Sequence, residues 1–365
     1  MTFTDWLPDV SCLTLKIAIA TYVMMMVAII KMGGRREQEG SSMRAIHLTA
    51  FGDPVACLEY VQIQEPPAPS PGQVLIGVEF SPIDLSDLLV VRGVYPLRPS
   101  LPSVIGNEGV GRILAVGPGV ENVAVGDRVL TPLYGLAWAE RIVVAAEGLF
   151  ALPANVDPQQ LAMLTINPPT AGLLLSEFVD LAPGDWVVQN AANSGVGRAV
   201  VAFAKARGFK TINLVRRPEL IDELKALGGD LVIVDAPEGL DLVKGALGSA
   251  APRLAIDGVG GPSAATLIDL LGRDGALVAY AALSKAPIAI SALALIFKRI
   301  SVRGFFLSDP EHAAKIAPFV VEAAELLRSG RLHAPVAATY PLSAIKDAVA
   351  HVESGGKVLL DVAAN

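Results

Sequence analysis

The chain has 365 residues, of which 52% are hydrophobic and 18% charged, and its formal net charge is −7. Two ordinary domains fit this length, each with its own hydrophobic core. No cluster of Lys and Arg stands out, so nucleic acid is excluded as an expected partner. The two cysteines, Cys12 and Cys57, are too few for a disulfide framework or a thiolate zinc cluster, and the four histidines show no metal-ligand spacing. We therefore expect no metal site.

Residues 1–42 differ in sequence pattern from the rest of the chain. Residues 17–30 form an uncharged apolar run between Lys16 and Lys31. This run is shorter than the roughly 20 apolar residues that a membrane span needs, although it could act as a weak anchor with the catalytic part in the cytoplasm. The alternative, which we favour, is that the protein begins at Met43, where the sequence starts like a soluble domain. We expect a cytoplasmic protein that contacts a membrane only if the apolar run inserts.

Short strands are predicted from residue 43 to about residue 164. Gln73–Phe80 alternates apolar and polar positions after a Pro-rich turn, and Gly109–Val116 and Arg128–Leu133 are separated by glycine turns. Short strands with this much glycine favour a small β-barrel or a sandwich.

From residue 167 to residue 307, strand-like runs alternate with helical ones. The predicted strands of this alternation are Asp185–Gln189, Lys210–Val215, Leu231–Val234, Leu254–Asp257 and Ala276–Tyr280. The predicted helices are Val196–Arg207, Glu219–Leu227, Asp241–Leu247 and Pro262–Leu271, and Ile300–Leu307 is a later strand-like run. This order predicts a doubly wound parallel sheet in an α/β fold. We expect residues 308–365, with a helix over Ala313–Ser329 and a strand over Lys357–Val362, to rejoin residues 43–166 in the first domain.

A glycine loop, NAANSGVG over Asn190–Gly197, follows a predicted strand and opens a helix. Gly195 and Gly197 let the backbone approach a pyrophosphate, and the helix N-terminus offers free N–H groups to it. The alternative is an ordinary strand-to-helix turn. Because the alternating sheet surrounds this loop, we favour dinucleotide binding.

The strand after this loop indicates which dinucleotide is bound. It ends on Arg216 and Arg217, where an NAD enzyme usually has Asp or Glu for the ribose hydroxyls. Two guanidiniums suit a 2′-phosphate, whereas a carboxylate would repel it. We expect NADPH; the alternative is a pair of solvated arginines.

Several motifs together resemble one known family. They are GVYPLRP (93–99), GNEGVG (106–111), INPPTA (166–171), VVQNAANSGVGRAV (187–200), TINLVRRPE (211–219) and RGFFLS (303–308). The chain resembles the zinc-free, mitochondrial-type 2-enoyl thioester reductases, a branch of the medium-chain dehydrogenases near the quinone oxidoreductases. The resemblance implies a GroES-like β-barrel domain, a Rossmann domain and a homodimer joined through the cofactor domains.

The same resemblance implies the site residues. It assigns the catalytic role to Tyr95, in the GVYP segment. Together with the glycine loop, it places cofactor contacts at Asn167, Asn193, Ser194, Gly195, Val196, Gly197, Arg216, Arg217, Tyr280, Ala281, Ala282, Leu283, Phe305, Phe306, Leu307 and Lys357.

Two departures from the family pattern concern the substrate. The family usually has Asn-Pro-Ser-Asp where this chain has the run from Asp84 to Asp87, and often Trp where this chain has Phe306. A third feature concerns zinc. Zinc alcohol dehydrogenases carry His in a GHE turn, where this chain has Asn107, so we expect no zinc and no alcohol oxidation.

The expected reaction is NADPH-dependent reduction of the C=C bond of trans-2-enoyl thioesters, carried on CoA or acyl carrier protein. Negative charge develops on the thioester oxygen, and a protonated Tyr95 can donate a hydrogen bond or a proton. Alternatively, Tyr95 packs a turn between Gly93 and Pro96. Two other functions stay open: an NADPH-dependent quinone or enone reductase, and a non-catalytic NADPH-binding protein.

Overall fold

The alternating runs form one six-stranded parallel sheet in the computed structural model, which describes residues 41–364. Its strands are β8 (Trp186–Gln189), β9 (Lys210–Val215), β10 (Leu231–Val234), β11 (Leu254–Asp257), β12 (Ala276–Ala279) and β13 (Ser301–Gly304). Their order is β10-β9-β8-β11-β12-β13, and every pairing is parallel. The predicted doubly wound sheet is confirmed. The strand order reverses between β8 and β11, the position where such sheets bind ligands at their carboxyl edge.

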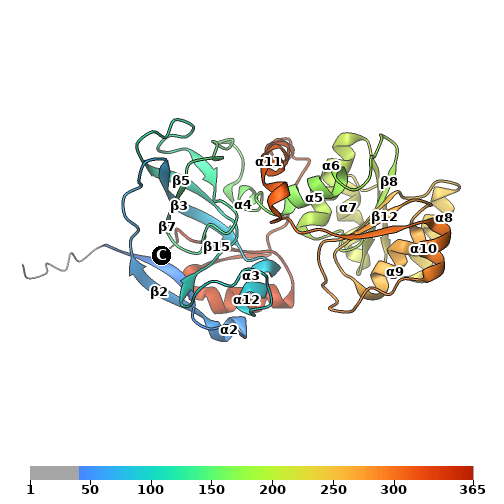
Figure 1. Ribbon diagram of the computed structural model, residues 1–365, viewed down its shortest axis with the longest axis horizontal. Helices are drawn as coiled ribbons and strands as arrows, with labels where there is room; N and C mark the ends of the chain where they lie inside the picture. Colours follow the sequence, from blue (N-terminus) through green and yellow to red (C-terminus); the bar gives the residue numbers. More distant parts are fainter. Residues whose placement is uncertain (1–40, 365) are drawn as a thin grey trace, which may run out of the picture. The chain divides into compact units, whose positions relative to one another are not determined.

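Helices connect the strands of this parallel-sheet lobe (Figure 1). They are α6 (Gly195–Arg207), the 3-10 turn η1 (Pro218–Leu220), α7 (Ile221–Leu227), α8 (Pro237–Leu247), α9 (Gly261–Leu270) and α10 (Ala292–Lys298). The helix α6 begins at the cap Ser194 and ends at Gly208, whose φ of 75° suits glycine. The strand β13 is shorter than predicted, because the chain leaves the sheet after Gly304 and buries Phe305 and Leu307 in a core cluster.

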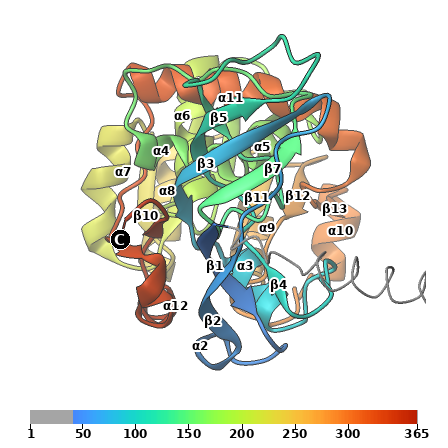
Figure 2. The ribbon, with the colours of Figure 1, turned by 90° about the vertical axis from the view of Figure 1, so that its left-hand side faces the viewer.

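The β-rich lobe contains two sheets, in which antiparallel pairings predominate and β14 pairs with β15 in parallel (Figure 2). One has the order β2-β1-β4 and consists of β1 (Ser42–Leu48), β2 (Leu58–Gln64) and β4 (Ser103–Val104). The other has the order β14-β15-β3-β5-β6, with β7 also pairing with β3. Its strands are β3 (Gln73–Pro82), β5 (Val110–Val116), β6 (Arg128–Leu130), β7 (Arg141–Ala145), β14 (Ala338–Pro341) and β15 (Val358–Asp361). The helices of the lobe are α2 (Pro54–Cys57), α3 (Leu85–Val91), the 3-10 turn η3 (Leu342–Ala344) and α12 (Ile345–Ser354). From the C-terminal tail, β15 pairs with β3 of this lobe in antiparallel fashion.

The remaining helices are α4 (Pro158–Leu161), α5 (Asn167–Ser176), the 3-10 turn η2 (Pro310–His312) and α11 (Ala313–Arg328). The helix α11 packs against α5 and α6, and Gly172 permits this because a Cβ there would lie 2.3 Å from the Phe319 ring. Thus α11 contacts helices of the predicted cofactor domain although its sequence lies in residues 308–365. The exact domain boundaries stay a prediction.

Within residues 41–364, no helix is long and apolar enough to cross a membrane. The apolar run at residues 17–30 and Cys12 lie outside the described residues.

Candidate active site

The predicted phosphate loop lies at the carboxyl edge of the parallel sheet, between β8 and α6. The Ser194 hydroxyl accepts a hydrogen bond from the Gly197 amide at 3.1 Å and caps the helix. A Cβ on Gly197 would lie 2.5 Å from a backbone oxygen of Ala192, and one on Gly195 would lie 2.7 Å from Asn167 Cγ. Both glycines are therefore required by packing within the protein. The free N–H groups of the first helical turn remain available for an anion.

Asn167 lies beside this loop and has an unsatisfied donor. Its side-chain nitrogen is buried and has no hydrogen-bond partner in the described part of the chain. A buried unpaired amide is costly, so a ligand oxygen at this place would be favoured. Arg198, which the sequence analysis did not select, donates to the Asn193 carbonyl at 3.1 Å and pairs with Glu223 at 2.7 Å. It ties the loop to α7.

Arg216 and Arg217 follow β9 at the same edge of the sheet. Both are exposed, and among residues 41–364 neither guanidinium has an ion-pair or side-chain hydrogen-bond partner. The two cations are thus free to bind a phosphate in a fork.

Tyr280, after β12, reaches the phosphate loop. Its ring approaches Gly258 so closely that a Cβ there would lie 2.6 Å from the hydroxyl. Burial raises the pKa of Tyr280 to about 12, while a hydrogen bond with Ser194 acts in the opposite direction. The structure therefore places the Tyr280 hydroxyl beside Ser194 of the glycine loop. Ala281 is partly exposed, and Ala282 and Leu283 continue as an exposed loop.

Tyr95 lies in a cluster of aromatic rings and hydroxyls. Its ring is 5.9 Å from that of Phe306, edge to face, and its hydroxyl is 3.1 Å from that of Tyr134. The Tyr134 hydroxyl is also 2.5 Å from Ser308 Oγ. Burial, followed by the hydrogen bond with Tyr134, raises the pKa of Tyr95 well above its ordinary value. The phenol is therefore protonated at neutral pH and can act as a donor.

The sequence analysis missed Tyr134 and Ser308. Ser308 closes the RGFFLS motif, so that motif carried a signal; Tyr134 lies in a turn with no motif around it. Of the three predicted contacts in the motif, only Phe306 faces Tyr95. Phe305 packs against Phe178 and His312, and Leu307 lies in the same core cluster, so these two can offer a ligand only their backbone.

A buried charge cluster lies in the same lobe as Tyr95. Lys357 Nζ is 2.5 Å from Asp84 Oδ1, so the predicted cofactor contact Lys357 is engaged by the acid that departs from the family pattern. Asp87 accepts from the backbone amides of Asp84 at 2.8 Å and Asn107 at 2.9 Å. Burial and the charge of Asp84 raise the pKa of Asp87 and of Glu108 well above the ordinary carboxyl range.

Glu108 connects this cluster to the cofactor side of the site. One of its oxygens accepts from the amides of Thr165 and Ile166, both at 2.9 Å, directly before Asn167. Its other oxygen is buried without a partner in the described chain, as is Asp84 Oδ2. No group of three or more His, Cys, Asp or Glu in residues 41–364 is arranged to hold a metal ion. At the position of the zinc enzymes' histidine, Asn107 donates to Ser86 Oγ at 2.9 Å.

Comparison with known proteins covers both lobes. Residues 70–154 match the alcohol dehydrogenase GroES-like domain, and residues 195–322 match the zinc-binding dehydrogenase family. The chain is 38% identical over 323 residues to the mitochondrial enoyl-acyl-carrier-protein reductase of Rattus norvegicus, and 37% identical over 323 residues to that of Homo sapiens. Each alignment covers 85% of this chain and 86% of the relative.

Solved structures have the same fold. A mitochondrial 2-enoyl thioester reductase heterodimer from Candida tropicalis superposes with a TM-score of 0.80 at 23% identity, covering 88% of this chain and 100% of that one. A putative NADPH:quinone reductase from Bacillus thuringiensis gives a TM-score of 0.79 at 27% identity, covering 88% and 99%. The GroES-like and Rossmann-type architecture expected from the sequence is confirmed.

Proposed function

Because this chain belongs to the medium-chain dehydrogenase/reductase family, in the branch of the mitochondrial-type enoyl thioester reductases, we propose that it reduces the C=C bond of trans-2-enoyl thioesters with NADPH. The substrate is carried on CoA or acyl carrier protein, and no zinc takes part. The observation that carries the proposal is the protonated phenol of Tyr95 beside Phe306, a residue of the segment that follows the cofactor sheet.

The residues at the sheet edge fit a dinucleotide phosphate. The unpaired amide nitrogen of Asn167, the glycine loop with its helix N-terminus, and the two free guanidiniums each provide what NADPH would need. We assign residues 167–307 to the cofactor domain and residues 43–166 with 308–365 to the substrate domain. The loop from Asn193 to Gly197 would hold the pyrophosphate, Arg216 and Arg217 the 2′-phosphate, and residues 280–283 and Phe306 the nicotinamide end.

When bound, NADPH supplies a hydride for the β-carbon of the enoyl group. The role of Tyr95 follows from the charge that this addition creates. Its phenol donates a hydrogen bond to the thioester oxygen as the enolate develops, and it is a source of the proton that completes the saturated chain. Phe306 and the half-buried setting of Tyr95 limit water around the reacting atoms and strengthen this interaction.

One rival is an NADPH-dependent quinone reductase, which the likeness to the Bacillus thuringiensis protein favours. A non-catalytic NADPH-binding protein is the other. NADPH absorbance followed with trans-2-enoyl-CoA and with a quinone in parallel separates the three functions. Turnover with the thioester supports the proposal, turnover with the quinone alone supports the first rival, and NADPH binding without any oxidation supports the second.

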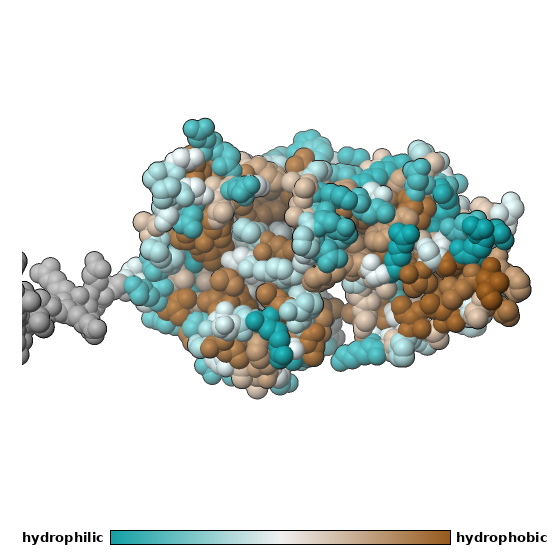
Figure 3. Space-filling view, in the orientation of Figure 1, coloured by the Kyte–Doolittle hydropathy of each residue, from teal (hydrophilic) through white to brown (hydrophobic). Residues whose placement is uncertain are grey.

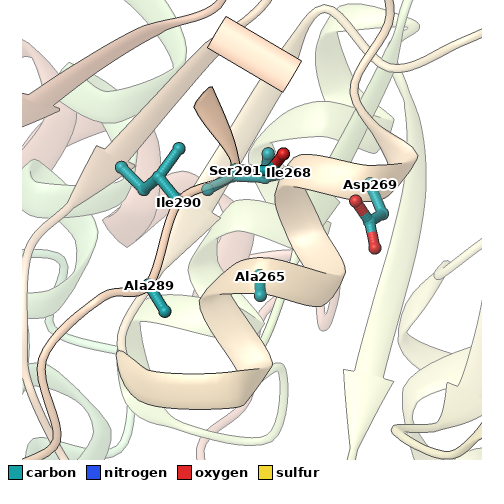
Figure 4. Close-up of a pocket in the computed structure, with 6 residues that line it drawn as sticks. All are labelled: Ala265, Ile268, Asp269, Ala289, Ile290 and Ser291. Atoms are coloured by element: carbon teal, nitrogen blue, oxygen red, sulfur yellow. The ribbon is translucent and has the colours of Figure 1, made fainter. Parts of the chain in front are cut away.

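The parallel-sheet lobe carries a surface suited to a second copy of the chain. The strand β13 is exposed along its length at the edge of the sheet, and α10 beside it exposes Leu293, Ile296 and Phe297 by 63%, 64% and 67%. Figure 3 shows apolar surface gathered around α10. A pocket of about 350 Å³ lies between α9 and residues 289–291, the segment that precedes α10 in the sequence (Figure 4).

An exposed strand edge with apolar neighbours favours pairing with another chain. We propose a homodimer through this surface. Light scattering should give twice the 38.0 kDa chain mass for the wild type and the monomer mass for Phe297→Asp. A monomeric wild type would overturn this proposal.

For location we propose the cytoplasm, with membrane association only if residues 17–30 insert. The relatives are named mitochondrial enzymes. Cell fractionation of the full-length chain tests the proposal. Recovery with mitochondria would contradict it, and recovery with the membrane fraction would indicate that residues 17–30 insert.

A further inference from the structure

Three hydroxyl groups form a continuous hydrogen-bonded chain that ends at Tyr95. The Tyr134 hydroxyl stands in the middle, 3.1 Å from the hydroxyl of Tyr95 and 2.5 Å from Ser308 Oγ. All three side chains are partly exposed, so Ser308 can exchange protons with solvent. Each hydroxyl can donate one hydrogen bond while accepting another, which is the requirement for passing a proton along a chain.

The backbone holds Tyr134 firmly in this position. Its φ is 60°, a left-handed conformation that is strained for a residue other than glycine, and strain of this kind collects at functional sites. The Tyr134 amide donates to the Asn107 carbonyl at 2.8 Å, and the Gly135 amide closes the turn onto Pro132 at 2.9 Å. A tyrosine that only filled space would need neither the strained turn nor two hydroxyl partners.

The chain of hydroxyls has no charged competitor. Within residues 41–364, no carboxylate or ammonium group hydrogen-bonds to any of the three hydroxyls. Burial, followed by the hydrogen bond with Tyr134, raises the pKa of Tyr95, and Asp87 adds to this only through its charge. A phenolate at Tyr95 is therefore unfavourable, and a turnover that takes the phenol proton requires rapid replacement.

We propose that Tyr134 is a proton-relay residue that reprotonates Tyr95 with protons from Ser308 and solvent, an inference that rests on the proposed function. As the β-carbon gains a hydride from NADPH, the O–H bond of Tyr95 breaks and a C–H bond forms at the α-carbon. The Tyr95 oxygen then takes the proton of Tyr134, Tyr134 takes that of Ser308, and Ser308 takes one from water. Each C=C bond thus consumes one hydride and one solvent proton, and NADP⁺ is released.

The variant Tyr134→Phe removes the hydroxyl and keeps the ring that packs edge to face on Tyr95. Tyr340→Phe is the matched control, because Tyr340 also loses a 3.1 Å hydroxyl contact, with His351, in the same lobe. For Tyr134→Phe we expect kcat to fall on the order of 10-fold, below the full effect of losing a general acid. We expect an unchanged KM for NADPH. We also expect a larger solvent deuterium isotope effect on kcat, because reprotonation of Tyr95 becomes rate-limiting. The control should stay within about twofold of the wild type.

A second readout needs no substrate. With tyrosine labelled at ¹³Cζ, the resonance assigned to Tyr95 should shift in Tyr134→Phe and stay in place in Tyr340→Phe. A Tyr134→Phe variant with wild-type kcat and an unchanged isotope effect would overturn the relay alone. If the wild type oxidises NADPH only with a quinone, the proposed substrate is wrong and the same comparison is made with the quinone. A wild type inactive with every acceptor would overturn both the proposed function and the relay.

Discussion

Replacing Lys357 with methionine tests whether this residue neutralises the buried acid cluster. The Asp84 and Lys357 side chains are only 10% and 19% exposed, so solvent screens their 2.5 Å ion pair weakly. Without the ammonium group, Asp84 lies beside Glu108 and Asp87 with no cation, and one of its oxygens is already unpartnered. Leaving a buried charge unpaired costs about 3–5 kcal/mol, and we expect Lys357→Met to lose about that much free energy of unfolding.

The assay is urea unfolding of the wild type, Lys357→Met, Asp84→Asn and the double variant at neutral pH. The double variant should recover most of the loss, since it leaves no unpaired charge at this pair. Lys346→Met is the control; Lys346 is exposed on α12, and its loss should change stability by less than about 0.5 kcal/mol. The reasoning is refuted if Lys357→Met stays within about 1 kcal/mol of the wild type but loses NADPH affinity. Lys357 would then be the cofactor contact that the family resemblance implies.

Three other predictions concern the same site. Because the folded state raises the pKa of Glu108, the free energy of unfolding of the wild type falls as the pH rises above the ordinary carboxyl range. Glutamine does not titrate, so the stability of Glu108→Gln relative to the wild type should increase from about pH 5 to about pH 8. A difference that does not change with pH would contradict this. Arg216→Ala and Arg217→Ala should each weaken NADPH binding by about 1.5–3 kcal/mol in fluorescence titrations while leaving NADH affinity unchanged; equal losses for both cofactors would exclude a 2′-phosphate contact. Gly197→Ala should reduce NADPH affinity at least on the order of tenfold, because its Cβ would lie 2.5 Å from a backbone oxygen, and wild-type affinity would show that the loop can move.

The parallel sheet was predictable because its signals are local. Lys210–Val215 and Leu254–Asp257 are short strand-like runs between turns, and the strands β9 and β11 have these bounds. Predictions were weaker in the β-rich lobe. The strand β14 (Ala338–Pro341) was missed because it is stabilised by pairing with β15. The helix α12 (Ile345–Ser354) was missed although it buries Ile345, Ala348, Val349 and Val352 at helical spacing, a signal that its sequence carries.

The site was only partly predictable for the same reason. Motifs indicated Tyr95, Asn167 and the arginine pair; the structure leaves the Asn167 amide nitrogen and the two guanidiniums free and gives the Tyr95 hydroxyl a partner in Tyr134. The ion pair between Asp84 and Lys357 joins residues 273 positions apart, and no sequence pattern connects them. Tyr134 was missed because its role depends on where a strained turn directs it.

The most direct test of the central claim is NADPH oxidation with trans-2-enoyl-CoA by the wild type and Tyr95→Phe, with a quinone in parallel. The account predicts thioester-dependent oxidation with kcat at least on the order of 100-fold lower in the variant, at similar NADPH affinity. Oxidation with the quinone alone, unaffected by Tyr95→Phe, would contradict it and leave Tyr95 as a residue that packs a turn.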